Sequence, residues 1–123
     1  MSRGSSRDMA EKWLLAEPDE DMRRELQSLI DGSSNELEDR FNGRLMFGTA
    51  GLRAEVGAGP NRMNRLVVRQ AAAGLVDYLL RTVEGSVEAG ILIGFDARRK
   101  SDVFAIDTAR VAAARGMKAM LLP

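Results

Sequence analysis

The feature that most constrains the fold is a pair of continuous apolar runs separated by an alanine-rich segment. Residues 91–95 read ILIGF, residues 118–122 read KAMLL, and the residues from 101 to 115 between them have a helical pattern that Gly116 closes. A continuous apolar run is typical of a strand that is buried on both faces of a sheet. Strand, helix and strand within about thirty residues form a βαβ unit, normally a right-handed parallel crossover. The sequence therefore predicts an α/β fold.

A long helix is predicted before this unit. Asn61 can cap it and Gly85 closes it. Its apolar residues recur at spacings of three and four, which is the helical period: Met63, Leu66, Val67, Gly74, Leu75, Tyr78 and Leu79.

The first 43 residues predict a tail and a helical arm. Residues 1–7 have no apolar periodicity and indicate a disordered tail. Residues 8–16 favour a short helix that Pro18 stops, and a second helix then runs to Gly32. A third short helix follows, with Ser33 and Ser34 as its caps and Asn42 and Gly43 at its end. We interpret residues 8–43 as a packing arm and residues 44–123 as the main domain.

The residue types that are absent exclude several kinds of chemistry. The 123-residue chain contains no Cys and no His, which excludes disulfides, thiolate zinc sites and Ser-His-Asp relays. Lys and Arg total 18, equal to Asp and Glu, so no broad field favours nucleic acid or an anionic membrane. No apolar stretch has the length of a membrane span or of a signal-peptide core, which predicts a cytoplasmic protein with no membrane partner.

Positive charge and glycine are concentrated in one segment. Residues 1–43 hold six bases and eleven acids, whereas residues 44–70 hold five arginines and one acid. The stretch RLMFGTAGLRAEVGAGP from residue 44 predicts two short strands joined by the turn Gly48–Gly51, followed by a loop. Gly48 and Gly51 let the backbone approach an anion, Thr49 adds a hydroxyl, and Arg53 adds a planar fork for two phosphate oxygens. A plain hairpin turn with an exposed arginine is the alternative.

Three other groups of residues are weaker candidates. Asp96, at the end of ILIGF, is placed as a site residue would be, although an Asp96–Arg98 pair that braces the following loop is the reading we favour. A stripe of arginines on the long helix can grip nucleic-acid phosphates, but no aromatic residue interleaves it and acidic residues of the arm are available as partners, so we expect no nucleic-acid partner. The stretch Gly57-x-Gly59 lacks the third glycine of a dinucleotide fingerprint. The stripe comprises Arg62, Arg65 and Arg69.

Two motifs together resemble the start of domain one of the α-D-phosphohexomutases, in the phosphoglucomutase/phosphomannomutase branch that includes phosphopentomutase. The first is FGTAGLR at residues 47–53, followed by GAGPNRMN at residues 57–64. The second is GFDAR at residues 94–98, with Ser101 and Phe104. The acidic arm is also similar to that of bacterial members. Ala54 stands where the family usually has Gly, a change that could crowd the turn.

The resemblance implies a three-layer α/β/α domain with a mixed sheet, preceded by a short helical arm. It also implies a reaction that interconverts sugar 1- and 6-phosphates, or pentose equivalents, through a phosphoserine and a bisphosphate intermediate with Mg²⁺ bound. Arg53 matches the family arginine that faces the active site, and Thr49 and Gly51 shape its turn. The phosphoserine loop and the Asp-rich metal loop of the family do not occur in this sequence. We therefore expect no catalytic residue and no cofactor or metal site in this chain.

These inferences leave two hypotheses open. The first is an N-terminal fragment of a phosphohexomutase, truncated after the strand that ends before Pro123, with a sugar phosphate as substrate of the full-length enzyme. The second is a non-catalytic module that keeps the phosphate-facing turn and binds a ligand or a protein. In either case an unpaired sheet edge would favour self-association.

Overall fold

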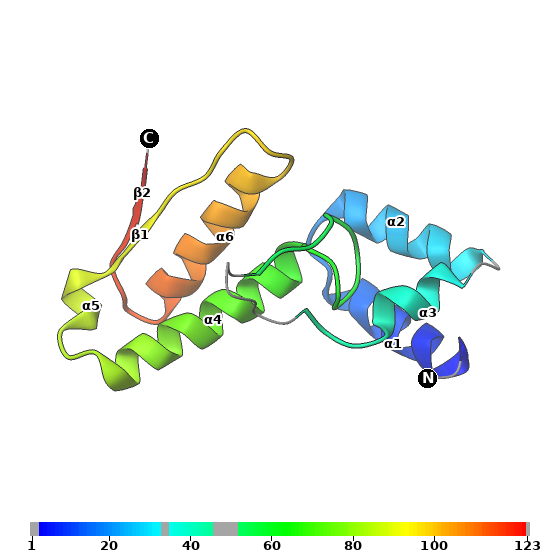
Figure 1. Ribbon diagram of the computed structural model, residues 1–123, viewed down its shortest axis with the longest axis horizontal. Coiled ribbons are helices and arrows are strands. Elements are labelled where there is room, and N and C mark those ends of the chain that lie inside the picture. The colour runs from blue at the N-terminus through cyan, green and yellow to red at the C-terminus, as the bar shows by residue number, and fades with distance from the viewer. Residues whose placement is uncertain (1–2, 33–34, 46–51, 123) are drawn as a thin grey trace. The chain divides into compact units, whose positions relative to one another are not determined.

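The structure, a computed structural model, describes residues 3–32, 35–45 and 52–122 (Figure 1). The chain divides into two compact units, Met1–Val67 and Val68–Pro123, which we describe separately. No helix among the described residues combines the length and the apolarity that a membrane crossing requires.

Three helices form the core of the first unit: α1 (Arg3–Ala16), α2 (Glu20–Asp31) and α3 (Glu36–Phe41). Their apolar faces meet, and Trp13 of α1 packs edge-on against Phe41 of α3 with ring centroids 5.9 Å apart. Together with Ala58, these helices form a cluster of side chains that are almost completely removed from water, which is the main stabilising contribution in a small fold. The buried residues are Ala10, Met22, Leu26, Ile30, Leu37, Phe41 and Ala58.

The ends of these helices follow the residue types that the sequence provides. Asp19 caps α2, because its carboxylate accepts hydrogen bonds from the backbone N–H groups of Asp21 and Met22. Gly32 follows the last turn of α2, as predicted. The N-cap of α3 is Asn35, and the predicted caps at residues 33 and 34 lie outside the described residues. Helix α1 begins at Arg3 rather than in the predicted region after residue 7, and the buried Ser6 shows that its first turns pack against the unit.

The second unit contains the βαβ arrangement that the sequence predicts. Strand β1 (Ile91–Ile93) and strand β2 (Ala119–Leu121) are parallel, and helix α6 (Ser101–Ala114) connects them and packs on both. Ile91 is in register with Ala119, and Ile93 is in register with Leu121. The mixed sheet stays a prediction, because the sheet formed by the described residues has only these two parallel strands.

Helix α4 (Arg65–Thr82) begins in the first unit and continues into the second. It starts four residues after the predicted cap, because the side chain of Asn64, rather than Asn61, accepts the backbone N–H of Val67 at 3.0 Å. The short helix α5 (Ser86–Ala89), which the sequence analysis missed, follows Gly85.

One prediction about burial is wrong. The run ILIGF is not buried on both faces, because Leu92 is 64% exposed and α6 packs on one side of a strand only three residues long. On α4, Leu75 and Tyr78, which belong to the apolar period of the helix, are exposed, whereas Val76 is fully buried. Val76 forms the core of the second unit with Ala112 and Met117.

The predicted pair of strands around residue 50 is also absent from the described residues. The turn itself, residues 48–51, lies outside them, and residues 44, 45 and 52–55 are not in strands. Only Val56 forms an isolated parallel bridge, with Met63.

Candidate functional site

The best-defined polar arrangement in the first unit is the loop of residues 57–64, which Asn64 holds from inside. The side chain of Asn64 is completely buried. Its Nδ2 donates hydrogen bonds to the carbonyls of Gly57 and Gly59, both at 2.8 Å. Because its Oδ1 also caps α4, this one side chain joins the loop to the start of the helix.

Arg40 of α3 holds the same loop from the other side. Its Nη1 donates to the carbonyl of Ala58 at 3.0 Å and lies 2.9 Å from Glu25 Oε1, while its Nη2 lies 2.9 Å from Glu36 Oε1. Burial by itself would lower the pKa of Arg40, but the hydrogen bonds and charges of the two glutamates outweigh it and raise the pKa. The guanidinium therefore stays charged, and its removal would leave buried acceptors unpaired.

The two glycines of this loop lie in close contact with Arg40. A Cβ at position 57 would lie 2.9 Å from Arg40 Nη1, and one at position 59 would lie 2.9 Å from the Arg40 carbonyl oxygen. Gly59 also has a φ of +111°, a conformation that other residues rarely adopt. The structure thus explains the Gly57-x-Gly59 pattern by packing and backbone conformation.

The two segments on either side of residues 46–51 both bond to this loop. On the upstream side, the Leu45 N–H donates to the Pro60 carbonyl at 3.1 Å. On the downstream side, the Met63 N–H donates to the Glu55 carbonyl at 2.8 Å, and the Gly57 N–H donates to the Met63 carbonyl at 3.0 Å. The loop of residues 57–64 therefore holds both flanks of the predicted phosphate-binding turn.

Of the predicted phosphate-facing residues, the structure describes Arg53 alone. Its side chain is exposed, and no hydrogen bond or ion pair joins it to the part of the chain that the structure describes. Thr49 and Gly51 lie outside the described residues. Arg53 lies two residues before Glu55, whose backbone carbonyl is hydrogen-bonded to the loop of residues 57–64. Its role toward phosphate stays a prediction.

The three arginines of the predicted stripe contact separate partners. Arg62 Nη2 lies 2.7 Å from Asp39 Oδ2, which confirms that an acid of the arm pairs with the stripe. Arg65 Nη1 lies 3.5 Å from the Pro18 carbonyl oxygen. Arg69 Nη2 lies 3.1 Å from Asp107 Oδ1, whose side chain is 1% exposed. The absence of a nucleic-acid partner stays a prediction.

The loop after β1 carries the other predicted pair. Arg98 Nε lies 3.2 Å from Asp96 Oδ2, and Asp96 Oδ1 accepts the Arg98 backbone N–H at 3.0 Å. The Asp96 backbone N–H in turn bonds to the hydroxyl of Ser101 in the first turn of α6. These are the contacts that a bracing role requires, and the role itself stays a prediction.

Sequence reasoning missed Arg40 and Asn64. For Asn64 a signal was available, because asparagine directly before a helical pattern is a preferred N-cap. For Arg40 no local pattern pointed to the role, since its partners at residues 25 and 58 are distant in sequence. Among the described residues, no group of three or more acidic side chains is arranged to hold a metal ion.

Comparison with known proteins identifies the class to which this chain belongs. The family described as phosphoglucomutase/phosphomannomutase, alpha/beta/alpha domain I, matches residues 44–123. A probable phosphoribomutase of Schizosaccharomyces pombe is 42% identical over 112 residues, which are 90% of this chain and 19% of that protein. A phosphoribomutase of Saccharomyces cerevisiae is 44% identical over 84 residues, 68% of this chain and 13% of that protein. A phosphoglucomutase of Staphylococcus saprophyticus is 42% identical over 81 residues, 66% of this chain and 14% of that protein.

The chain therefore belongs to the phosphoglucomutase/phosphomannomutase family, through its α/β/α domain I. The resemblance drawn from the two motifs is confirmed. The chain spans less than a fifth of the length of these relatives. No solved structure matches it.

Proposed function

We propose that this chain is the domain I part of a mutase that moves a phosphoryl group between the positions of a sugar phosphate. The family match over residues 44–123 supports this proposal, as do relatives named phosphoribomutase and phosphoglucomutase. The observation that carries it is local. An exposed Arg53 with no partner among the described residues follows a segment whose two flanks are hydrogen-bonded to one loop, residues 57–64.

In this proposal Arg53 binds the phosphate of the substrate through two N–H groups of its guanidinium, while Thr49 and Gly51 shape the turn before it. Such a charged fork is suited to phosphate oxygens, and its benefit depends on the backbone being held in place before the substrate arrives. Arg40 and Asn64 hold the loop through hydrogen bonds to the carbonyls of residues 57–59. They are positioning residues and do not touch the substrate.

The proposal assigns the remaining chemistry to other parts of a longer enzyme. The family resemblance implies a phosphoserine, a bound Mg²⁺ and a sugar bisphosphate activator. The described residues offer no cluster of acids for a metal ion, so we derive no step through a metal held by this chain. By itself the chain supplies phosphate recognition and no nucleophile.

A chimaera tests the proposal. The matching segment of the Schizosaccharomyces pombe relative would be replaced by this chain, and sugar-phosphate mutase activity would be measured with the natural Arg53, with Arg53→Lys and with Arg53→Ala. We expect the Ala variant to lose about 2–4 kcal/mol of transition-state stabilisation, roughly thirty- to a thousand-fold, mainly in kcat. The Lys variant should recover part of the loss, because it keeps the charge without the planar fork. Full activity of Arg53→Ala in a chimaera that is active with Arg53 would contradict the proposal.

A second candidate function is a non-catalytic module that binds phosphate or a protein partner. The apolar side chains exposed in the second unit favour it, since a surface of this kind is typical of an interface. Translation of the DNA beyond the codon for residue 123, in all three frames, distinguishes the two. The family resemblance implies a phosphoserine loop of sequence Thr-Ala-Ser-His-Asn-Pro and an Asp-rich metal loop. Their presence there would support the mutase, and unrelated coding sequence would support the module.

A further inference from the structure

Glu25 of α2 connects the helical arm, residues 8–43, to the loop of residues 57–64. Along α2 it stands next to Leu26 and three residues after Met22, and both of these are buried. The packing of α2 therefore fixes where the backbone of Glu25 lies. Its half-buried side chain reaches the loop, because Glu25 Oε1 would be 3.4 Å from a Cβ at position 57.

Two carboxylates from different helices hold the guanidinium of Arg40. Glu36, one turn earlier on α3, pairs with Nη2, whereas Glu25 pairs with Nη1, each at 2.9 Å. Nη1 is also the atom that donates to the Ala58 carbonyl at 3.0 Å. A guanidinium is a planar, rigid fork, so a partner on each Nη atom fixes the direction of the hydrogen bond to the loop. Because Glu36 pairs with Nη2, Glu25 is the acid that directs Nη1.

The position of Arg40 affects the segment on which Arg53 lies. The loop that Arg40 holds through the Ala58 carbonyl is hydrogen-bonded to the Leu45 N–H and the Glu55 carbonyl, on the two sides of residues 46–51. Arg53 lies two residues before Glu55. An error of about 1 Å in the placement of a group that acts on a substrate can lower the rate by roughly a hundredfold.

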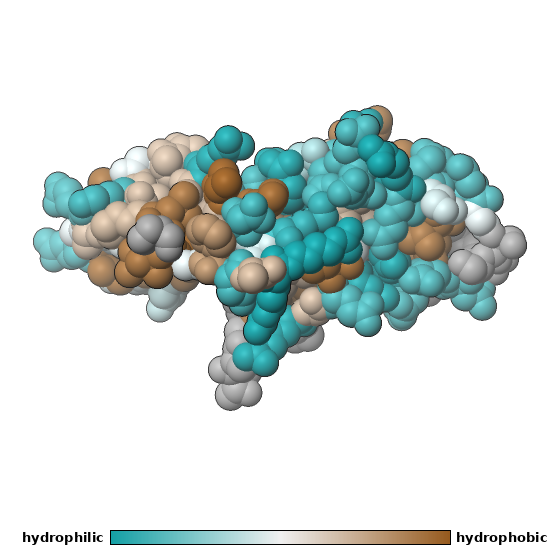
Figure 2. Space-filling model, turned by 90° about the horizontal axis from the view of Figure 1, so that it is seen from above, coloured by the Kyte–Doolittle hydropathy of each residue, from teal (hydrophilic) through white to brown (hydrophobic). Residues whose placement is uncertain are grey.

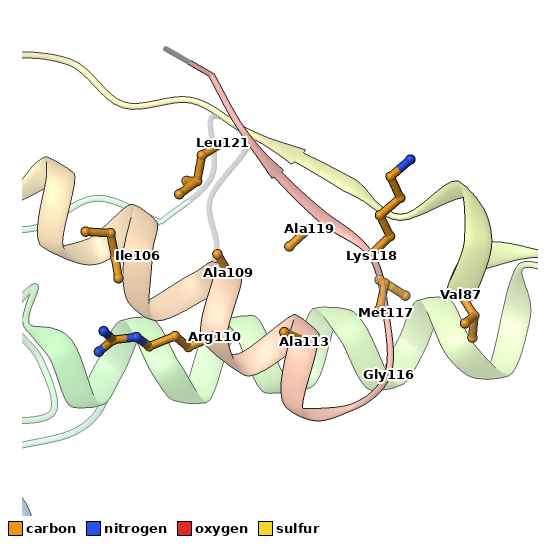
Figure 3. A pocket seen from close by; sticks show the side chains of 10 residues that line it. All are labelled: Val87, Ile106, Ala109, Arg110, Ala113, Gly116, Met117, Lys118, Ala119 and Leu121. Atoms are coloured by element: carbon orange, nitrogen blue, oxygen red, sulfur yellow. The ribbon is translucent and has the colours of Figure 1, made fainter.

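This network differs from the hollow beside β2 in the second unit (Figure 3). The side chains that line that hollow are mainly apolar, and the two charged residues there, Arg110 and Lys118, are both cations. Among its described lining residues there is no acid. An arginine held between two acids, as Arg40 is, is therefore a feature of the first unit and not of the hollow.

We infer that Glu25 is a positioning residue for the phosphate-binding turn and acts through Arg40 and the Ala58 carbonyl. The helical arm is then part of the phosphate site and does more than pack, although the family match begins at residue 44, after α3 has ended. The inference rests on the proposed function, because it names a further residue for the same site.

Hydrogen exchange in the full chain tests the first step, from Glu25 to the flanks of the turn, and requires no activity. In Glu25→Ala, the amides of Leu45 and Met63 should exchange about tenfold faster, because their hydrogen bonds hold these flanks. The amide of Leu26 is the internal reference and should change by less than about twofold. No acceleration at Leu45 and Met63, or equal acceleration of all three amides, would overturn the inference. In the latter case Glu25 would only stabilise the unit as a whole.

Two matched variants separate the carboxylate of Glu25 from other effects on α2. Glu25→Gln should restore part of the protection, since its amide oxygen still accepts a hydrogen bond from Arg40 Nη1 but carries no charge. Glu20→Ala removes an exposed glutamate of the same helix, which pairs with Arg24 at 3.3 Å, and should leave the amides of Leu45 and Met63 unchanged. Faster exchange at these amides in Glu20→Ala, to the same degree as in Glu25→Ala, would contradict a specific role of Glu25.

A double-mutant cycle in the active chimaera tests the second step, from the turn to the phosphate. With Arg53 present, Glu25→Ala should lower kcat/KM about tenfold. In the Arg53→Ala background the same change should lower it by less than about twofold, because the turn then presents no fork to the phosphate. An equal loss in both backgrounds would overturn the inference, since a purely structural role lowers activity whether or not Arg53 is present. Full activity of Arg53→Ala would refute the proposed function, whereas an impaired Arg53→Ala beside a fully active Glu25→Ala would refute this inference alone.

Discussion

At the scale of single residues, the loop of residues 57–64 depends on a few atoms in close contact. Arg40 and Asn64 satisfy three consecutive carbonyls between them, at distances of 2.8–3.0 Å. A buried carbonyl that loses its hydrogen-bond partner lowers the stability of the folded state. The glycines opposite Arg40 are part of the same arrangement, because any side chain there would push the arginine away.

Gly59→Ala tests this packing at one atom. The new Cβ would lie 2.9 Å from a backbone oxygen at a φ of +111°, so we expect a loss of about 2–4 kcal/mol in unfolding free energy. Gly43→Ala is the matched control, since Gly43 also has a positive φ but nothing lies within 4 Å of its Cβ position. That variant should lose about 1–2 kcal/mol. Equal losses in urea denaturation of the two variants would show that the contact with Arg40 contributes nothing.

Glu17 gives the first unit a dependence on pH. Its desolvation by burial raises its pKa, and the nearby Asp19 carboxylate adds to this, against opposing hydrogen bonds from Trp13 and the Asp19 backbone and the charge of Arg65. A raised pKa means that the folded state binds the proton more tightly than the unfolded state. The contribution of Glu17 to stability is therefore full below its unfolded pKa and is lost as pH rises through its folded pKa.

Glu17→Gln should remove this dependence. At pH 7 the variant should be at least as stable as the natural chain. As the pH falls from 7 to 4, the natural chain should gain stability relative to the variant. Melting temperatures at several pH values measure this difference. Glu11→Gln, an exposed glutamate of α1, is the control and should show no such trend. A difference between Glu17→Gln and the natural chain that is constant with pH would refute the assignment.

At the scale of secondary-structure elements, α4 is joined to its surroundings at three points. Asn64 joins its start to the loop. Further along, Arg69 pairs with Asp107 in the middle of α6, and Asp77 pairs with Arg115 at the C-terminal cap of α6. The Arg69–Asp107 pair has a carboxylate that is almost fully buried, whereas the Asp77–Arg115 pair is exposed and contributes little. The position of α4 therefore depends mainly on its buried contacts.

Asn64→Asp tests the connection between the loop and α4. Aspartate keeps the acceptor that caps the helix but replaces the two donated hydrogen bonds by repulsion between a carboxylate and two carbonyls. We expect a loss of about 2–4 kcal/mol in unfolding free energy. Asn61→Asp, which changes a more accessible amide of the same loop, should lose less than about 1 kcal/mol. Similar values for the two variants would contradict the central role of Asn64.

At the scale of the whole chain, the two units differ in how well they cover apolar groups. In the first unit Leu15 is the one large apolar residue exposed among those described, whereas the second unit exposes ten. The core of the second unit, by contrast, consists of Val76, Ala112 and Met117. Figure 2 shows apolar surface on this part of the molecule. Exposed apolar surface favours association in water.

We therefore expect the isolated chain to be of low stability and to associate. Size-exclusion chromatography with light scattering should show species larger than the monomer, and thermal unfolding should begin below the usual range of compact domains. A monodisperse monomer that melts cooperatively above about 65 °C would contradict this prediction. The same preparation, shown to be free of host mutase, should not interconvert glucose 1-phosphate and glucose 6-phosphate, even with Mg²⁺ and a bisphosphate activator.

The amino-acid sequence by itself determined the α/β class, the parallel βαβ unit, the end of α2 at Gly32, and the family. These features depend on residues close together along the chain, where apolar period, capping and motif spacing act directly. Only the tertiary structure decided that Val76 is buried while Leu75 and Tyr78 are exposed, and that Arg40 holds the carbonyl of Ala58. Those outcomes depend on which distant element packs against a residue. No local pattern contains that information, because burial and hydrogen bonding between distant residues arise only when the chain folds.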